Sequence, residues 1–111
     1  MATDQWHEST EQLTEATRNM TRAINSLKEE LEAIDWYQQR IDATTDEALR
    51  TILTHNRDEE KEHASMVLEW IRRHDPVFDR NLKKYLFTTS PITERTDEVE
   101  PQQTGAKRWN G

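Results

Sequence analysis

Residues 49–71 read LRTILTHNRDEEKEHASMVLEWI, and this stretch decides the fold. At about 100° per residue, the large apolar side chains that project in one direction are Leu49, Ile52, Val67, Trp70 and Ile71. Such spacing is typical of an amphipathic α-helix, because the faces of a strand alternate every two residues. The stretch therefore predicts a long helix with one apolar stripe, running from about residue 45 to residue 74.

The middle of that stripe is polar. Asn56, Glu60 and His63 project in the same direction as the apolar residues above and below them. A buried carboxylate costs several kcal/mol unless it is paired or bound to a metal, so Glu60 needs a cation. Glu60 and His63 form a Glu-x-x-His pair on one helix face, and a carboxylate beside an imidazole suits iron, manganese or zinc.

An earlier segment has the same helical period. Ser9 and Gln12 have the spacing of a capping box, which predicts a helix from near Thr10 to about Arg40. Its apolar positions recur in steps of three and four residues: Leu13, Ala16, Met20, Ala23, Ile24, Leu27, Leu31 and Ile34. A second capping box, Thr44 with Glu47, follows at once. So short a link predicts two antiparallel helices.

A third, shorter helix is expected after Asp75, which precedes Pro76 as an N-cap precedes the first helical residue. Its apolar face consists of Val77, Phe78, Leu82, Tyr85 and Leu86. The predicted fold is all-α: an antiparallel two-helix hairpin plus a short C-terminal helix. Residues 1–8 are expected to be flexible, residues 9–92 to form the helical domain, and residues 93–111 to be a disordered tail.

Glu30 supplies a carboxylate from the first helix. It projects toward the hairpin seam, whereas Glu29, Glu32 and Trp36 project from the opposite side. Counted from the expected turn, Glu30 is about ten residues out and Glu60 about fifteen, which predicts a height mismatch of about 7 Å.

Half of a known metal site is present in this set. Four-helix di-iron carboxylate proteins need a Glu from each of two helices and a Glu-x-x-His from each of the other two. Two copies related by a two-fold axis supply all of it and place the metals at their interface. The sequence therefore predicts a homodimer that closes a ferritin-like four-helix bundle.

Composition points the same way. Of the 111 residues, 32% are hydrophobic and 33% charged, so a self-sufficient core is not expected in so short a domain. A net charge of -7 disfavours nucleic acid and anionic membranes as main partners. The lack of cysteine excludes disulfides and thiolate sites. No run approaches the roughly 18 apolar residues of a membrane span, so we expect a soluble protein.

Several strings resemble the encapsulated ferritin family. The matching stretches are EELEAIDWY (29–37), HNRDEEKEHA (55–64), LEWIRR (68–73), YLF (85–87) and SPIT (90–93). The resemblance spans roughly residues 8–93. It implies a ferroxidase that lacks a ferritin cage and assembles as a ring of dimers, expected to be a decamer, inside a cytoplasmic encapsulin nanocompartment. The shell protein is then a second partner, although residues 103–111 do not clearly match a shell-docking peptide.

The resemblance also implies roles for individual residues. Glu30, Glu60 and His63 become iron ligands, with two irons at each dimer interface and Glu60 bridging them. Tyr37 is implied to lie close to the site. Glu29, Glu32 and Trp36 are implied to lie at a second subunit contact, near a route by which metal reaches the site.

Two other functions stay open. A non-catalytic helical oligomer, in which a metal such as zinc only joins the subunits, requires the same ligands. A rubrerythrin-like peroxidase uses a similar site, although such enzymes typically carry a Cys-ligated iron and this chain has no Cys. Each residue also has an ordinary structural interpretation: Glu60 paired with a base, His63 hydrogen-bonded in an interface, Tyr37 as packing, and Glu29 and Glu32 as solvated surface.

Overall fold

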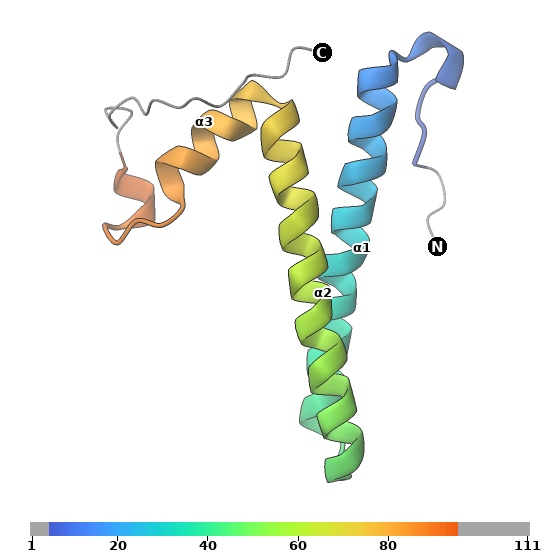
Figure 1. The fold of residues 1–111 in the computed structure, drawn as a ribbon, viewed down its shortest axis with the longest axis vertical. Helices are drawn as coiled ribbons and strands as arrows, with labels where there is room; N and C mark the ends of the chain where they lie inside the picture. Colours follow the sequence, from blue (N-terminus) through green and yellow to red (C-terminus); the bar gives the residue numbers. More distant parts are fainter. Residues whose placement is uncertain (1–4, 96–111) are drawn as a thin grey trace. The chain divides into compact units, whose positions relative to one another are not determined.

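The computed structural model describes residues 5–95. Within this range the chain forms three α-helices and two short 3-10 helices and contains no β-strand, which confirms the all-helical prediction (Figure 1). None of the described helices combines the length and apolarity needed to cross a membrane. The chain divides into two units, the first ending at Glu69 and the second beginning at Trp70. Each unit is described by itself.

The first unit is a helical hairpin of α1, Glu15–Ala43, and most of α2, Glu47–His74. Helix α1 begins five residues later than the predicted start at Thr10, so the prediction was wrong. Ser9 makes no side-chain capping bond, and Thr10–Gln12 form a separate 3-10 helix, η1. The N-cap is Thr14, whose hydroxyl oxygen accepts a hydrogen bond from the backbone N–H of Thr17 at 3.0 Å.

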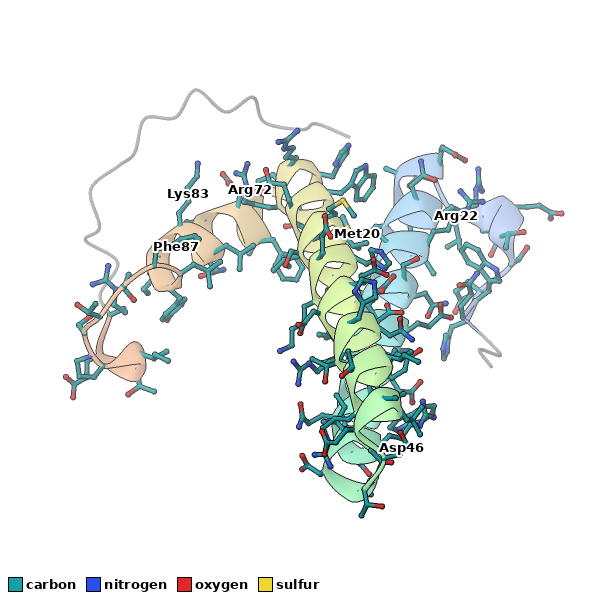
Figure 2. The ribbon with its side chains drawn as sticks, turned by 60° about the horizontal axis from the view of Figure 1, so that its bottom comes forward. Met20, Arg22, Asp46, Arg72, Lys83 and Phe87 are labelled. Atoms are coloured by element: carbon teal, nitrogen blue, oxygen red, sulfur yellow. The ribbon has the colours of Figure 1, made fainter. Side chains whose placement is uncertain are left out.

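The turn of the hairpin also differs from its prediction. Helix α1 continues to Ala43 rather than ending near Arg40. Asp46, at the hairpin turn (Figure 2), accepts a hydrogen bond from the backbone N–H of Leu49, 3.0 Å away, so it caps α2. The Thr44 hydroxyl oxygen accepts instead from the N–H of Asp46. An aspartate directly before the helix displaced the expected Thr44–Glu47 box, because both residues are good caps and Asp46 lies closer to the first turn.

Few side chains of this unit are buried. Ile41 on α1 and Ala64 on α2 are its buried hydrophobic residues. Large apolar side chains on both helices stay exposed: Ile24, Leu31, Trp36, Leu49, Ile52 and Met66. The two helices of a hairpin can cover only one stripe of each other, so a third and fourth helix are needed to cover the rest.

The segment before α1 folds back on the helix. Gln5, within the residues expected to be flexible, contacts Asn25 of α1 through their side-chain amides. Arg18 donates to the backbone carbonyls of Thr10 and Leu13, at 2.6 Å each, and so ties η1 to the first turn of α1. The other residues of the expected flexible N-terminus that lie before Gln5 are outside the described range.

The second unit begins with the last turn of α2. Asp75 caps α3, Pro76–Tyr85, by accepting hydrogen bonds from the N–H groups of Val77 and Phe78, both at 2.9 Å, as the sequence predicted. Beyond α3, Phe87 has a φ of 61° and is fully exposed. The expected disordered tail starts within a second 3-10 helix, η2, Ile92–Glu94, and Arg95 donates to the Lys84 carbonyl at 3.0 Å. The rest of that tail lies outside the described residues.

One buried charge holds α3 to the end of α2. Asp79 is 6% exposed and accepts hydrogen bonds from Arg72 of α2 and, at 3.2 Å, from Lys83 of α3; both bases are labelled in Figure 2. Burial alone raises the pKa of Asp79, but the hydrogen bonds from Arg72 and Lys83 outweigh it and hold the pKa below its ordinary value. The ion pair is therefore a stabilising contact of this unit.

Replacing Asp79 with Asn should destabilise the protein by about 2 kcal/mol, because two bases lose their buried charged acceptor. Since the folded-state pKa is lowered, the unfolded chain binds more protons below about pH 4, and the stabilisation is lost as pH falls through that range. Thermal unfolding followed by circular dichroism should show a gap between wild type and Asp79→Asn that shrinks with acidification. Asp75→Asn is the control, because asparagine retains the cap and should keep most of the stability. A gap that is constant with pH contradicts this account.

Candidate metal centre

Glu30, Glu60 and His63 converge in the seam of the hairpin. One ligand atom from each lies within 4.8 Å of the other two. The Nδ1 atom of His63 is 3.5 Å from Oε1 of Glu30 on α1 and 3.5 Å from Oε1 of Glu60 on α2. The structure thus brings together all three residues that the sequence proposed as ligands.

The expected height mismatch between the two glutamates is absent, and the helix boundaries explain why. The link between α1 and α2 is centred on Thr45. Glu30 lies fifteen residues before Thr45 and Glu60 fifteen residues after it. In an antiparallel hairpin, residues equally far from the turn lie at the same height. The error came from ending the first helix near Arg40, which moved the turn toward Glu30.

Glu30 carries the electrostatic strain of the cluster. Its Oε1 atom is buried and has no hydrogen-bond partner. A side-chain hydrogen bond with the neighbouring Glu60 carboxyl favours the protonated form and raises the pKa of Glu30, and burial raises it further. The contacts with His63 lower the pKa, but they offset these effects only in part. Two carboxylates held side by side repel each other, and an unpartnered buried oxygen costs free energy. Both penalties are relieved by a bound cation.

The geometry fits a transition-metal ion. Two ligands about 2.1 Å from one ion, at a tetrahedral angle, lie about 3.4 Å apart. Both His63–Glu separations match this value. Two carboxylate oxygens and one imidazole nitrogen suit iron, manganese or zinc better than a cation such as Ca²⁺, which prefers oxygen ligands only. The imidazole side chain is still 46% exposed, so the cluster is open on that side.

The other proposed site residues lie elsewhere on α1. Glu29, Glu32 and Trp36 are exposed, in agreement with a direction away from the seam. Tyr37 is half-buried, and its ring lies under the guanidinium of Arg40, 5.5 Å from the ring centre. Tyr37 lies on α1 about two helical turns from Glu30, on the side of the hairpin turn. The roles of these four residues stay predictions.

Sequence reasoning missed one polar contact between the helices. Arg57 of α2 donates to the side-chain carbonyl of Gln38 on α1 at 2.6 Å. The signal was available in the α1 register, because Glu30, Ile34, Gln38 and Ile41 follow one another in steps of four, four and three residues. A polar residue in that row predicts a polar partner on the facing helix.

A comparison with protein families decides which family this chain comes from. The model of the EncFtn-like family matches residues 5–89, which include both hairpin helices, α3 and all three clustered ligands. The chain belongs to this family. The resemblance that the sequence strings indicated is thereby confirmed.

Comparison with individual proteins agrees with this assignment. The chain is 57% identical over 96 residues to a ferritin-like protein of Thermotoga maritima, covering 86% of this chain and 84% of that protein. It is 58% identical over 92 residues to an encapsulated ferritin-like protein of Rhodospirillum rubrum, covering 83% of this chain and 66% of that protein. A third relative, the encapsulin nanocompartment cargo protein EncC of Myxococcus xanthus, is 36% identical over 85 residues, covering 73% of this chain and 65% of that one.

A solved structure shows the same fold. The crystal structure of protein ne0167 from Nitrosomonas europaea superimposes with a TM-score of 0.79 at 60% sequence identity, and the match covers 82% of this chain and all of that one. This chain spans about two thirds of the length of the Rhodospirillum and Myxococcus proteins. Those two proteins therefore carry additional sequence that has no counterpart in the matched region.

Proposed function

We propose that this protein is a ferroxidase, which oxidises Fe(II) to Fe(III) with O2 at a di-iron centre formed between two copies of the chain. The observation that carries the proposal is the cluster itself. Two glutamates and a histidine from two helices meet within 4.8 Å around a buried carboxylate oxygen that has no hydrogen-bond partner. These are the ligand types of the four-helix di-iron carboxylate proteins, and one chain supplies half of the ligands that such a site needs.

A dimer supplies the missing half. One chain presents three ligand atoms and leaves the His63 side of the cluster open. A two-fold axis through that open side would bring a second Glu30, Glu60 and His63 opposite the first set, and the same contact would cover apolar residues such as Leu49 and Ile52. The ring of dimers, expected to be a decamer, extends this proposal.

For the oxidation of Fe(II), the protein mainly has to hold the ligands in position. Fe(II) is the substrate: two ions each give one electron to O2, which takes up two protons and becomes hydrogen peroxide, and both ions leave as Fe(III). In this proposal Glu60 would bridge the two ions, and Glu30 and His63 would complete the ligands of each ion. Carboxylate oxygens bind Fe(III) as well as Fe(II), so Glu30 and Glu60 can hold the metal before and after the electron is lost. His63 would offer a ring nitrogen as the third ligand atom.

Titration of the protein with Fe(II) under anaerobic conditions, followed by air, tests the proposal directly. Binding should saturate near one iron per chain, because two ions are shared by two chains. After air is admitted, the near-ultraviolet absorbance of Fe(III) should rise much faster than in buffer. Light scattering in the same sample should report an oligomer that iron stabilises. Oxidation no faster than in buffer would favour a structural metal site, and a faster rate with peroxide than with O2 would favour a peroxidase.

We extend the proposal to an encapsulin nanocompartment in the cytoplasm. Two relatives are named as encapsulated or as encapsulin cargo, and an open oligomer has no closed cavity in which to hold mineral. In this setting the shell protein is the second partner, and the oxidised iron is stored or detoxified inside it. The candidate docking segment is the tail of residues 93–111, of which residues 96–111 lie outside the described residues.

A further inference from the structure

We propose that Arg57 and Gln38 form a positioning clamp that sets the spacing of the metal ligands before metal binds. The inference rests on the proposed function and names residues that act on its site from outside it. Arg57 lies on α2 one helical turn before Glu60, on the side of the hairpin turn. Its side chain is 19% exposed, so the guanidinium lies largely within the protein.

The guanidinium is held on two of its edges. Its Nη1 atom donates across the seam to Oε1 of Gln38 at 2.6 Å. Its Nε atom donates to Oδ1 of Asp58 at 3.0 Å, and its Nη2 atom forms an ion pair with the same oxygen at 2.9 Å. A planar guanidinium group that is bound on both edges can rotate little, so it holds Gln38 at a fixed distance from α2.

Two cross-helix contacts at different heights fix a helix pair better than one. The Arg57–Gln38 contact and the His63–Glu30 contact are separated by about 9 Å along α2 and about 12 Å along α1. Together they oppose both sliding and rotation of α1 against α2. Without metal, the second contact is weak, because Glu30 and Glu60 repel each other and the His63 distances of 3.5 Å are long for hydrogen bonds. In the metal-free protein, the Arg57–Gln38 contact is then the stronger of the two contacts that fix α1 against α2.

The charge of the clamp is arranged so that it does not oppose the metal. An uncompensated guanidinium one turn from Glu60 would repel a divalent cation. Asp58 is adjacent to Arg57, accepts a hydrogen bond from its Nε atom and forms an ion pair with its Nη2 atom, so the pair contributes no net charge. Gln38 is neutral, so the contact across the seam adds none either. The expected contribution is therefore geometric, and it should affect metal affinity more than the oxidation step.

Co(II) titration, followed by the visible absorbance of the bound ion, tests the clamp without redox chemistry. Arg57→Ala should weaken Co(II) binding about tenfold, the lower end of the effect of residues that support metal ligands. The spectrum at saturation should stay unchanged, because the ligands are the same. In the oxidation assay, the half-saturating Fe(II) concentration should rise by the same factor while the maximal rate is retained. Gln38→Ala should behave similarly, and the double variant should be no worse than either single variant.

Controls separate positioning from folding. Arg22→Ala removes an exposed α1 arginine and should leave Co(II) affinity unchanged. Arg57→Lys keeps the positive charge but lacks the planar guanidinium group, so it should recover Co(II) binding only in part. Wild-type affinity in both Arg57→Ala and Gln38→Ala overturns the clamp, as does a lower maximal rate at an unchanged half-saturating concentration. If wild-type Co(II) binding is itself insensitive to Glu60→Gln, the metal centre is misplaced and the proposed function fails with it.

Discussion

Replacing Glu60 with Gln is expected to abolish rapid Fe(II) oxidation, with a loss of about a hundredfold or more. Residues that only support metal ligands already cost about 10–100-fold when they are changed, and Glu60 is proposed as a ligand itself. Glutamine keeps the size of the side chain but removes its charge, so the cation loses one of the two carboxylates of the cluster. Stopped-flow absorbance after mixing Fe(II)-loaded protein with air-saturated buffer measures the effect.

The same substitution at Glu62 is the matched control. Glu62 lies on the same helix, two residues further along, and is exposed outside the cluster. Glu62→Gln should oxidise Fe(II) at the wild-type rate, and His63→Ala should lose the rapid phase as Glu60→Gln does. Equal rates in wild type, Glu60→Gln and His63→Ala would show that the cluster is not where oxidation occurs. Unchanged helical content in each variant ensures that the comparison concerns the site.

The helices of the hairpin were predictable from the sequence because their period is strong. Apolar residues of both helices recur in steps of three and four over about eight turns. The Asp75-Pro76 pair marks the start of α3. The helix ends were less predictable. Ser9, Thr10, Thr14, Thr44 and Asp46 are all good caps, and which of them caps a helix depends on local geometry that the sequence pattern does not contain.

The three ligands were predictable because they violate the pattern around them. Glu60 and His63 stand in an apolar stripe, and Glu30 faces the seam while Glu29 and Glu32 do not. Their meeting at one height was not predictable, because an error of three residues in the end of α1 shifts Glu30 by about 5 Å along its axis. The Arg57–Gln38 contact was missed for a different reason. The position of Gln38 in the seam-facing row predicts a polar partner on α2, but the sequence pattern does not show that this partner is Arg57.

Removal of metal should weaken the association of this chain with itself about a hundredfold for each ion that the dimer binds. If a metal ion binds only when two half-sites meet, its binding free energy is added to the dimer: about 2.7 kcal/mol for each ion at a metal concentration one hundred times its dissociation constant. Zn(II) isolates this effect, because it binds the same ligands and has no redox chemistry. Sedimentation velocity of protein with chelator and with Zn(II), over a range of protein concentrations, measures the two dissociation constants.

Two variants decide whether the cluster is the source of this coupling. Glu30→Ala should remove the dependence on Zn(II), since it deletes the carboxylate that carries the buried, unpartnered oxygen. Glu29 is its neighbour on the exposed side of α1, and Glu29→Ala should keep the full dependence on Zn(II). Should Zn(II) bind once per chain and leave the association unchanged, the three ligands form a complete site within one hairpin, and the shared di-iron centre is wrong. Should both variants lose the coupling, the metal acts through the outer face of α1, and the dimer forms there and not across the open side of His63.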